Sequence, residues 1–294
     1  MRLAEFISSS RRTILFDGAM GTQLAEAGAA MSGSANISQP TLVTTIHRGY
    51  SKLGVDLITT NTLTMNRIFI ESHGVGVDVR DVNLAGAKLA RAAMKRGQYL
   101  LGDVSSTGKL LYPSGTLREE DAFETYREQA SILAEGGVDG FIVETMIDVR
   151  EAKCALRACR ETGLPVIVSM AFQTVRNGGH TVMGDSARDC ARTLANEGPI
   201  ALGANCGSVT PSEMAEIVAW MKEASSLPII AQPNAGRPKF ADGRTSFDMT
   251  PSDFAAGAHK CIRNGARLVG GCCGTSPAHI QALIRLVTGD RQEW

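Results

Sequence analysis

The sequence has little that would point to a membrane, a secreted scaffold or a nucleic-acid partner. No apolar run approaches the ~18 residues that a membrane-spanning helix needs, and the first residues, MRLAEFISSSRR, lack the apolar segment of a secretory signal. Thirty Lys and Arg residues balance thirty Asp and Glu residues, so charge gives no argument for either kind of partner. We therefore expect a cytoplasmic protein that binds neither nucleic acid nor membrane.

The chain also lacks a low-complexity linker, and its 294 residues, 44% of them hydrophobic, are sufficient for one large core. Its seven cysteines are an odd number in a chain that is neither small nor secreted in character. These features disfavour a disulfide framework. Reduced thiols that bind a metal or take part in catalysis are the preferred interpretation.

One pattern recurs along the chain: a short apolar run, a polar or glycine-rich turn, and a helical stretch. The apolar runs, which we interpret as strands, lie at 13–16, 56–60, 99–102, 140–143, 166–172, 200–206, 228–231 and from 268 toward Cys272 and Cys273. Helical patterns lie at 38–53, 117–135, 149–161, 187–196, 212–224 and 252–264, and a further helix that contains His279 follows the Cys272-Cys273 turn. Thr210-Pro211 and Thr250-Pro251 are typical of an N-cap followed by Pro at the first helical position.

Eight strands that alternate with helices predict an α/β protein with a parallel sheet, and the count favours a single (β/α)8 TIM barrel spanning residues 1–294. A doubly wound open sheet is the alternative. That fold usually carries a G-x-G-x-x-G phosphate loop after its first strand, and residues 17–22 read DGAMGT instead.

Cysteines stand at the ends of two predicted strands. Cys272 and Cys273 lie between glycines, and Cys206 ends another apolar run and precedes a glycine. Adjacent side chains of a strand point to opposite faces, so both thiols of the pair can face one point only where the backbone bends. Three thiolates match a catalytic zinc site with one open position. The alternative is that all three are small buried residues, as we expect for Cys154, Cys159, Cys190 and Cys261 in helical patterns.

Active sites of this fold lie at the C-terminal ends of the strands, so the residues there are candidates. They are Asp17, Thr60, Asn61, Asp103, Glu144, Met170, Cys206, Gln232, Asn234, Cys272 and Cys273. Asp17 and Glu144 suggest a pair of carboxylates that faces an amino group, although loop capping is an equally simple role. The backbone N–H groups of Ala19 and Met20, in a glycine-flanked turn, are candidates for binding a carboxylate.

Three thiolates and Zn²⁺ carry a net charge of −1, which makes the metal a poor activator of water. Such a site suits a fourth thiol better, because the metal keeps it as the nucleophilic thiolate. The pattern therefore indicates alkyl transfer onto a substrate thiol.

These motifs resemble the zinc-dependent homocysteine S-methyltransferase family, nearly from end to end. The resemblance rests on residues 17–22 (DGAMGT), 60–62 (TNT), 144–146 (ETM), 205–206 (NC), 232–236 (QPNAG) and 270–275 (GGCCGT). It implies a (β/α)8 barrel with Cys206, Cys272 and Cys273 as ligands of Zn²⁺ and as the catalytic centre through that metal.

The resemblance further implies that Asp17 and Glu144 bind the amino group of homocysteine. The Ala19 and Met20 main chain would lie near its carboxylate, and Asn234 would shape the same pocket. The product would be methionine.

The QPNAG form and residues 108–111 (GKLL) are most similar to the homocysteine module of cobalamin-dependent methionine synthase. One departure is the turn after the third strand, where that module has Gly-Pro-Thr and this chain reads Ser105-Ser106-Thr107. The departure falls in the loop that would face the methyl donor, so it bears on which donor the chain uses.

Because folate and cobalamin domains are absent from the 294 residues, we expect the methyl group to come from a corrinoid carried by a separate protein. S-methylmethionine or betaine is the alternative donor, and the chain could equally be a split module. A different thiol acceptor, the reverse reaction, and a thiol- or zinc-binding module without catalysis are the remaining hypotheses.

Overall fold

The computed structural model describes residues 1–241 and 244–289. Its centre is one parallel sheet of eight strands. The strands are β1 (Ile14–Leu15), β2 (Leu57–Thr59), β3 (Tyr99–Val104), β4 (Gly140–Met146), β5 (Val166–Met170), β6 (Ala201–Asn205), β7 (Ile229–Gln232) and β10 (Ala266–Val269). Each corresponds to one apolar run of the sequence.

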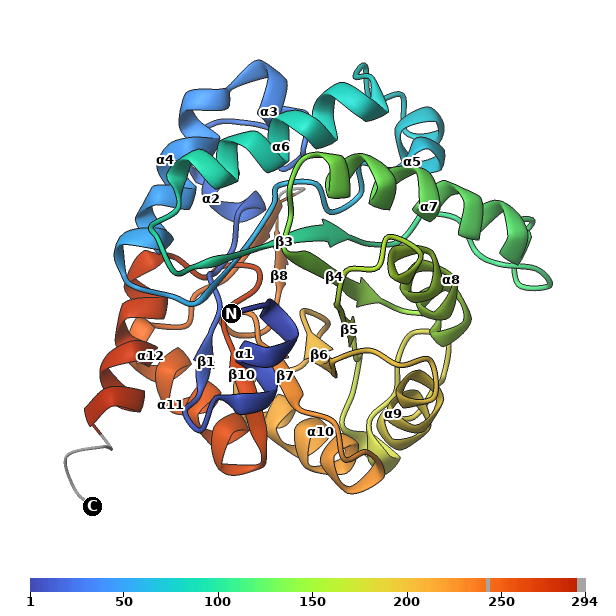
Figure 1. Ribbon diagram of the computed structural model, residues 1–294. Coiled ribbons are helices and arrows are strands. Elements are labelled where there is room, and N and C mark those ends of the chain that lie inside the picture. The colour runs from blue at the N-terminus through green and yellow to red at the C-terminus, as the bar shows by residue number, and fades with distance from the viewer. Residues whose placement is uncertain (242–243, 290–294) are drawn as a thin grey trace.

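The sheet closes on itself between its first two strands. Its order is β1-β10-β7-β6-β5-β4-β3-β2, and a parallel bridge joins Phe16, next to β1, to Leu57 of β2. Two backbone hydrogen bonds complete this seam, from Asp17 N–H to the Leu57 carbonyl at 3.1 Å and from Asp56 N–H to the Leu15 carbonyl at 2.8 Å. The predicted single (β/α)8 barrel is confirmed, and the open-sheet alternative is wrong (Figure 1).

Helices surround the barrel (Figure 1). The longer ones are α4 (Pro40–Lys52), α6 (Val79–Ala93), α7 (Glu119–Glu135), α8 (Val149–Arg160), α9 (Ala187–Ala195), α10 (Pro211–Ala224), α11 (Pro251–Arg263) and α12 (Pro277–Gly289). The predicted N-caps are confirmed, because the Thr210 and Thr250 hydroxyls accept hydrogen bonds from the backbone of the third helical residue. Among the described residues, none of these helices has both the length and the apolar character needed to cross a bilayer.

Several elements have no counterpart in the sequence analysis. The largest is α6, whose N-cap Asp78 accepts hydrogen bonds from the Arg80 and Asp81 N–H groups. The others are α1 (Leu3–Ser9), α2 (Gly21–Glu26), α3 (Ala35–Ser38), α5 (Arg67–Ser72), a 3-10 turn (Arg176–Gly178) and the hairpin of β8 (Lys239–Ala241) and β9 (Arg244–Ser246). The short helices lie before β1 or in the loops after β1 and β2.

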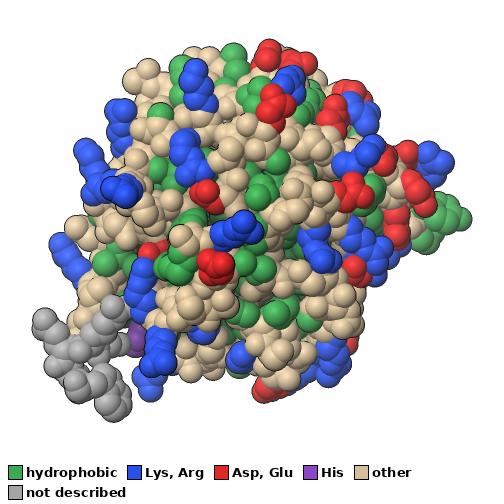
Figure 2. All heavy atoms as spheres, in the orientation of Figure 1, with side chains coloured by type: hydrophobic (Ala, Val, Ile, Leu, Met, Phe, Trp, Pro, Cys, Tyr) green, Lys and Arg blue, Asp and Glu red, His purple; other side chains and the backbone are tan. Residues whose placement is uncertain are grey.

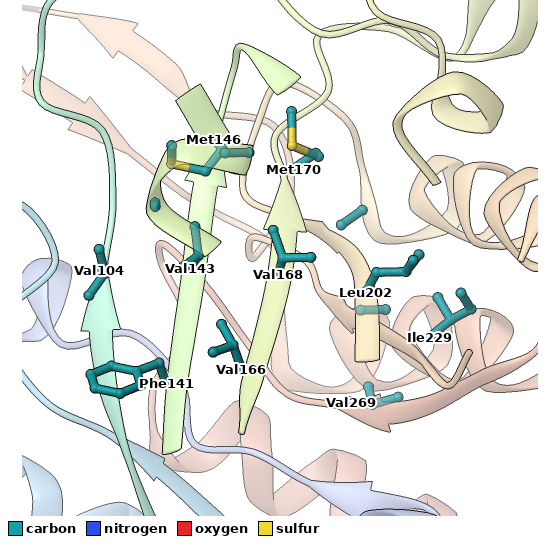
Figure 3. Close-up of a cluster of buried hydrophobic side chains, with 14 of the residues drawn as sticks. Val104, Phe141, Val143, Met146, Val166, Val168, Met170, Leu202, Ile229 and Val269 are labelled. Atoms are coloured by element: carbon teal, nitrogen blue, oxygen red, sulfur yellow. The ribbon is translucent and has the colours of Figure 1, made fainter. Parts of the chain in front are cut away.

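Successive strand residues face two separate apolar layers, as the pleat requires. Within β4, Ile142 belongs to the cluster inside the barrel, whereas Phe141 and Val143 belong to the layer between barrel and helices. Figure 3 shows this outer layer, including Phe141, Val143, Val168 and Leu202. Inside the barrel, Leu3 and Ile7 of α1 join the strand side chains, so α1 closes the N-terminal end of the barrel (Figure 1).

The face that carries α1 shows both basic and acidic side chains (Figure 2). Some of them pair, such as Arg91 with Asp139 at 2.9 Å. Over the whole sequence, basic and acidic residues are equal in number, so the chain carries no net formal charge. The candidate residues lie at the opposite end of the barrel, where the strands end.

Candidate functional site

A cavity of about 160 Å³ opens at the C-terminal ends of the barrel strands. Most of the candidates named from the sequence line it: Asp17, Ala19, Met20, Thr60, Asn61, Asp103, Glu144, Gln232, Cys272 and Cys273. No Lys or Arg is among the described residues that line it. The predicted convergence of polar strand ends and thiols on one mouth is therefore present.

The three predicted thiols meet beside this cavity, which Cys272 and Cys273 line and Cys206 does not. The Sγ atoms of Cys206, Cys272 and Cys273 all lie within 4.8 Å of one another, and those of Cys206 and Cys273 are 3.9 Å apart. Each side chain is partly accessible rather than sealed in the core. A set of three sulfur donors at this spacing can hold one metal ion.

Bent backbone brings the sulfurs together. Cys206 has a left-handed φ of 54° directly after β6, and its N–H donates to the Gln232 carbonyl at 3.2 Å. The next residue must be glycine, because a Cβ on Gly207 would stand 2.2 Å from the Phe172 carbonyl oxygen. On the other side, Cys272 N–H donates to the Pro233 carbonyl at 2.9 Å, which ties the cysteine pair to the end of β7.

The thiols stabilise one another electrostatically. Hydrogen bonds from Cys272 and Cys273 hold the pKa of Cys206 well below its usual range, and the same contacts raise the pKa of Cys272 and of Cys273. Of the three free thiols, Cys206 is therefore the one that loses its proton most readily. By contrast, burial raises the pKa of Cys154 to about 11 and that of Cys261 to about 12, as expected of cysteines that only pack.

Three buried carboxyl groups share the cavity. Asp17 accepts hydrogen bonds from the Thr59 N–H at 2.9 Å and from the Thr59 hydroxyl at 3.3 Å, yet burial raises its pKa to about 7. Burial and the Cys206 charge raise the pKa of Glu144 to about 8. The Asp103 pKa also rises through burial and through Glu144, and its Oδ1 has no hydrogen-bond partner. The group lacks a counter-charge and suits a cationic ligand.

The turn after β1 offers fewer free donors than its sequence suggests. Ala19 N–H already donates to the Thr275 hydroxyl at 3.0 Å, and the Ala19 carbonyl accepts from the Tyr50 hydroxyl at 2.8 Å. Met20 N–H donates to no acceptor within the described residues. Of the two proposed backbone donors, only that of Met20 is available for a ligand carboxylate.

Asn234 lies between the thiols and the strand end. Its Nδ2 donates to the Gly207 carbonyl at 3.0 Å, and its Oδ1 is buried without a partner. Its side chain is also one of the groups that lower the pKa of Cys206. It therefore stands beside the sulfur cluster rather than in the lining of the cavity.

Three residues of the site were assigned no role from the sequence. Thr59 supplies both donors to Asp17, Thr275 holds Ala19, and Asn205 contacts Glu144 and Cys272. Asn205 has a partial signal in the Asn-Cys pair at 205–206. The contacts of the other two depend on strands that are distant in sequence, so no local pattern indicates them.

Comparison with known proteins gives the family. Residues 14–287 match the model of a family described as homocysteine S-methyltransferase, and the chain belongs to that family. It is 30% identical over 298 residues to the methionine synthase of Mycobacterium tuberculosis, and 29% identical over 300 residues to that of Mycobacterium leprae. Both alignments cover 95% of this chain but only 25% and 24% of the relatives. The chain thus spans about a quarter of their length.

Solved structures agree on the fold. The metallated Escherichia coli homocysteine methyltransferase MmuM superposes with a TM-score of 0.74 at 22% identity, covering 94% of this chain and 97% of that one. Its oxidized form gives 0.77 at 22%, covering 97% and 99%. A carboxyl transferase domain of Rhizobium etli pyruvate carboxylase reaches 0.60 at 15%, covering 99% of this chain and 45% of its own. At these identities, the likeness concerns the barrel alone.

Proposed function

We propose that this chain transfers a methyl group to the thiol sulfur of homocysteine and so forms methionine, with a zinc ion held by Cys206, Cys272 and Cys273. The observation that carries the proposal is a cluster of three thiols that adjoins a cavity lined by uncompensated buried carboxyl groups. A substrate that carries both a thiol and an amino group matches this site, because its thiol would bind at the metal and its amino group would pair with the carboxyl groups. Membership of the family points to the same chemistry.

The donor set fits zinc. Sulfur ligands in a set of three leave one tetrahedral position for a further ligand, and Asn234, beside Cys206, has an unpartnered Oδ1. When bound, zinc would keep the substrate thiol as its thiolate, and the net −1 charge of the three-thiolate site would leave that sulfur nucleophilic. The reaction forms the sulfur–methyl bond, breaks the donor–methyl bond and releases the thiol proton.

The protein's own residues would bind and orient the amino acid. Asp17 and Glu144 would accept hydrogen bonds from its ammonium group, which supplies the counter-charge that the cavity lacks. The Met20 N–H would donate to the carboxylate, with the Ala19 main chain forming the adjacent wall. Asn234 would shape the pocket near the sulfur. Binding at both ends fixes the thiol toward the cysteines, and such orientation lowers the barrier to transfer.

We propose a methyl-corrinoid on a separate protein as the donor, because the matched relatives are named methionine synthases and the QPNAG segment at 232–236 resembles the homocysteine module of the cobalamin-dependent enzyme. Residues 1–294 would act as one homocysteine-binding barrel domain, of which 242–243 and 290–294 lie outside the described residues. Seven unpaired cysteines agree with the reducing conditions of a cytoplasm.

A two-step experiment tests the function. Homocysteine is first titrated into zinc-loaded protein, and methionine formation is then measured with a methyl-corrinoid protein, free methylcobalamin, S-methylmethionine and betaine. We expect saturable binding and product with the corrinoid donor. Product with S-methylmethionine or betaine, and none with the corrinoid donors, would mean that the methyl donor is that small molecule. Stoichiometric zinc without product from any donor and thiol would favour a binding module instead.

A further inference from the structure

The side chain of Asn205 lies at the centre of the site although it does not line the cavity. It is fully buried at the end of β6. Its amide contacts two proposed functional groups, the Glu144 carboxylate with Nδ2 to Oε2 at 3.1 Å and the Cys272 sulfur with Nδ2 to Sγ at 3.8 Å. No other residue in the described part of the chain hydrogen-bonds to both.

The orientation of this amide is fixed by its other partners. Its Oδ1 accepts from the Thr145 backbone N–H and from the Ser169 hydroxyl, both at 2.8 Å. A backbone N–H can only donate, so the oxygen must face the Thr145 backbone N–H, and the Nδ2 group must lie on the side of Glu144 and Cys272. The contact also supports Thr145 in its left-handed conformation, with a φ of 58°.

The Nδ2 group has fewer hydrogens than acceptors. It carries two hydrogens, but three acceptors surround it, since the Thr145 hydroxyl oxygen also lies 2.7 Å away. The short contact to Thr145 takes one hydrogen. The Glu144 oxygen and the Cys272 sulfur then share the other, so a change at one partner alters the bond to the second.

We propose that Asn205 is a positioning residue that links recognition of the substrate amino group at Glu144 to the sulfur of Cys272. This inference rests on the proposed function. In the free site the shared hydrogen belongs mainly to Glu144, as the two distances indicate. Once the ammonium group engages Glu144, the hydrogen becomes available to Cys272. A hydrogen bond to a metal-bound thiolate draws electron density from that sulfur and adjusts what it donates to the metal.

Two variants remove the shared hydrogen in different ways. Asn205→Ala deletes the amide, whereas Asn205→Asp keeps the oxygen that faces Thr145 and Ser169 and replaces the Nδ2 donor with a second oxygen beside the Glu144 carboxylate. Ser169→Ala is the matched control, because it removes one contact on the oxygen side only. Circular dichroism and thermal unfolding of the metal-free proteins monitor the fold of all three.

Two readouts then separate positioning from simple structural damage. The first is homocysteine affinity of the zinc-loaded proteins, which we expect to fall about tenfold or more in both Asn205 variants, the size of a hydrogen bond to a charged group. The second is the sulfur-to-metal charge-transfer absorption of the cobalt(II)-loaded proteins, which should shift in both. The Ser169→Ala protein should match the wild type in both measurements.

Combination with Glu144→Gln tests the link itself. If Asn205 acts through Glu144, the two losses should not add. The homocysteine affinity of the double variant Glu144→Gln/Asn205→Asp should then be no more than about threefold below that of the single variant with the lower affinity. Glu144→Gln should also alter the cobalt absorption without homocysteine when Asn205 is present, and leave it unaltered in the Asn205→Asp protein.

The outcomes are distinct from those of the proposed function. Unchanged affinity and absorption in both Asn205 variants, or fully additive losses with Glu144→Gln, would overturn the link. If wild-type protein binds metal but no homocysteine, the proposed substrate is wrong. The link is then decided by the cobalt absorption alone: dependence of the Glu144→Gln effect on Asn205 supports it, and independence overturns it.

Discussion

The Sγ atoms of Cys206 and Cys273 lie 3.9 Å apart although the two residues are 67 positions apart in the chain. Two features cause this approach: a left-handed bend at Cys206 after β6, and the attachment of the cysteine pair to the end of β7 through Pro233. Neighbouring parallel strands bring their C-terminal ends to one edge. The barrel thus joins two short sequence signals into one sulfur cluster.

Replacement of any one of the three clustered thiols should release the metal. We expect Cys206→Ser, Cys272→Ser and Cys273→Ser each to lower bound zinc well below one equivalent, because a hydroxyl is a poor substitute for a thiolate ligand. Far-UV circular dichroism should stay as in the wild type. Elemental analysis after gel filtration measures the zinc. The control is Cys154→Ala, a buried helical cysteine outside the cluster, which should keep its zinc; a full equivalent in any of the three serine variants would refute the assignment of that ligand.

Loss of the Glu144 charge should affect the substrate more than the metal. Glu144→Gln keeps the shape of a side chain that lines the cavity but removes the charge that we propose pairs with an ammonium group. We expect about tenfold or more weaker homocysteine binding, by calorimetry, with zinc affinity changed far less.

The matched control for the Glu144→Gln variant is Glu151→Gln. Glu151 is a buried carboxylate of α8 that accepts from Thr107 and Tyr126 and does not line the cavity. Its Gln variant should bind homocysteine like the wild type. Equal losses of metal and homocysteine in Glu144→Gln would indicate that Glu144 supports the structure only.

Burial of Asp17 should make the metal-free protein less stable as pH rises. The unfolded carboxyl group ionises near pH 4, whereas the folded group has a pKa of about 7. Between these values the folded state binds more protons, so this group's contribution falls as pH rises from about 4 to about 7.

Asp17→Asn removes that titration and keeps an acceptor for the Thr59 N–H. Relative to wild type, the free energy of unfolding of the Asn variant should therefore gain about 3 kcal/mol between pH 4 and pH 7.5. Urea unfolding at both pH values measures it. A wild-type-to-variant difference that does not change with pH would mean that Asp17 does not titrate as its burial indicates.

Helix α1, which closes the N-terminal end of the barrel, should contribute to the stability of the protein and not to the function of the site. Ile7 of α1 is 1% exposed and packs with the side chains inside the barrel. Ile7→Ala should cost about 2–4 kcal/mol in the free energy of unfolding, as expected for a buried large-to-small change. Zinc content and homocysteine affinity of the folded protein should be unchanged. Reduced metal binding at full folding would instead connect α1 to the site.

The fold followed from local patterns because each strand has an apolar run and most helices have a clear start. Thr210 and Thr250 cap helices where the sequence indicates it. Helix α6 was not predicted, although Asp78 is a residue type that favours the N-cap position. The hairpin of β8 and β9 was not predicted either, because strands of only three residues leave too short a pattern in the sequence.

The site was harder to predict than the fold, and for a physical reason. Cys206, Cys272 and Cys273 are found from residue type and flanking glycines, and the structure brings their sulfurs together. The hydrogen bond from Thr59 to Asp17 depends on register between strands. Thr145 and Cys206 have positive φ values that neither residue type favours. Such contacts exist only once the barrel closes.

The central claim is that three cysteine sulfurs hold one zinc ion and leave a position for the substrate thiol. X-ray absorption at the zinc edge, on the loaded protein with and without homocysteine, tests this most directly. The account predicts three sulfur neighbours at ~2.3 Å before homocysteine is added and four afterwards. Fewer than three sulfur neighbours at the start, or a sulfur count that homocysteine leaves unchanged, would contradict it.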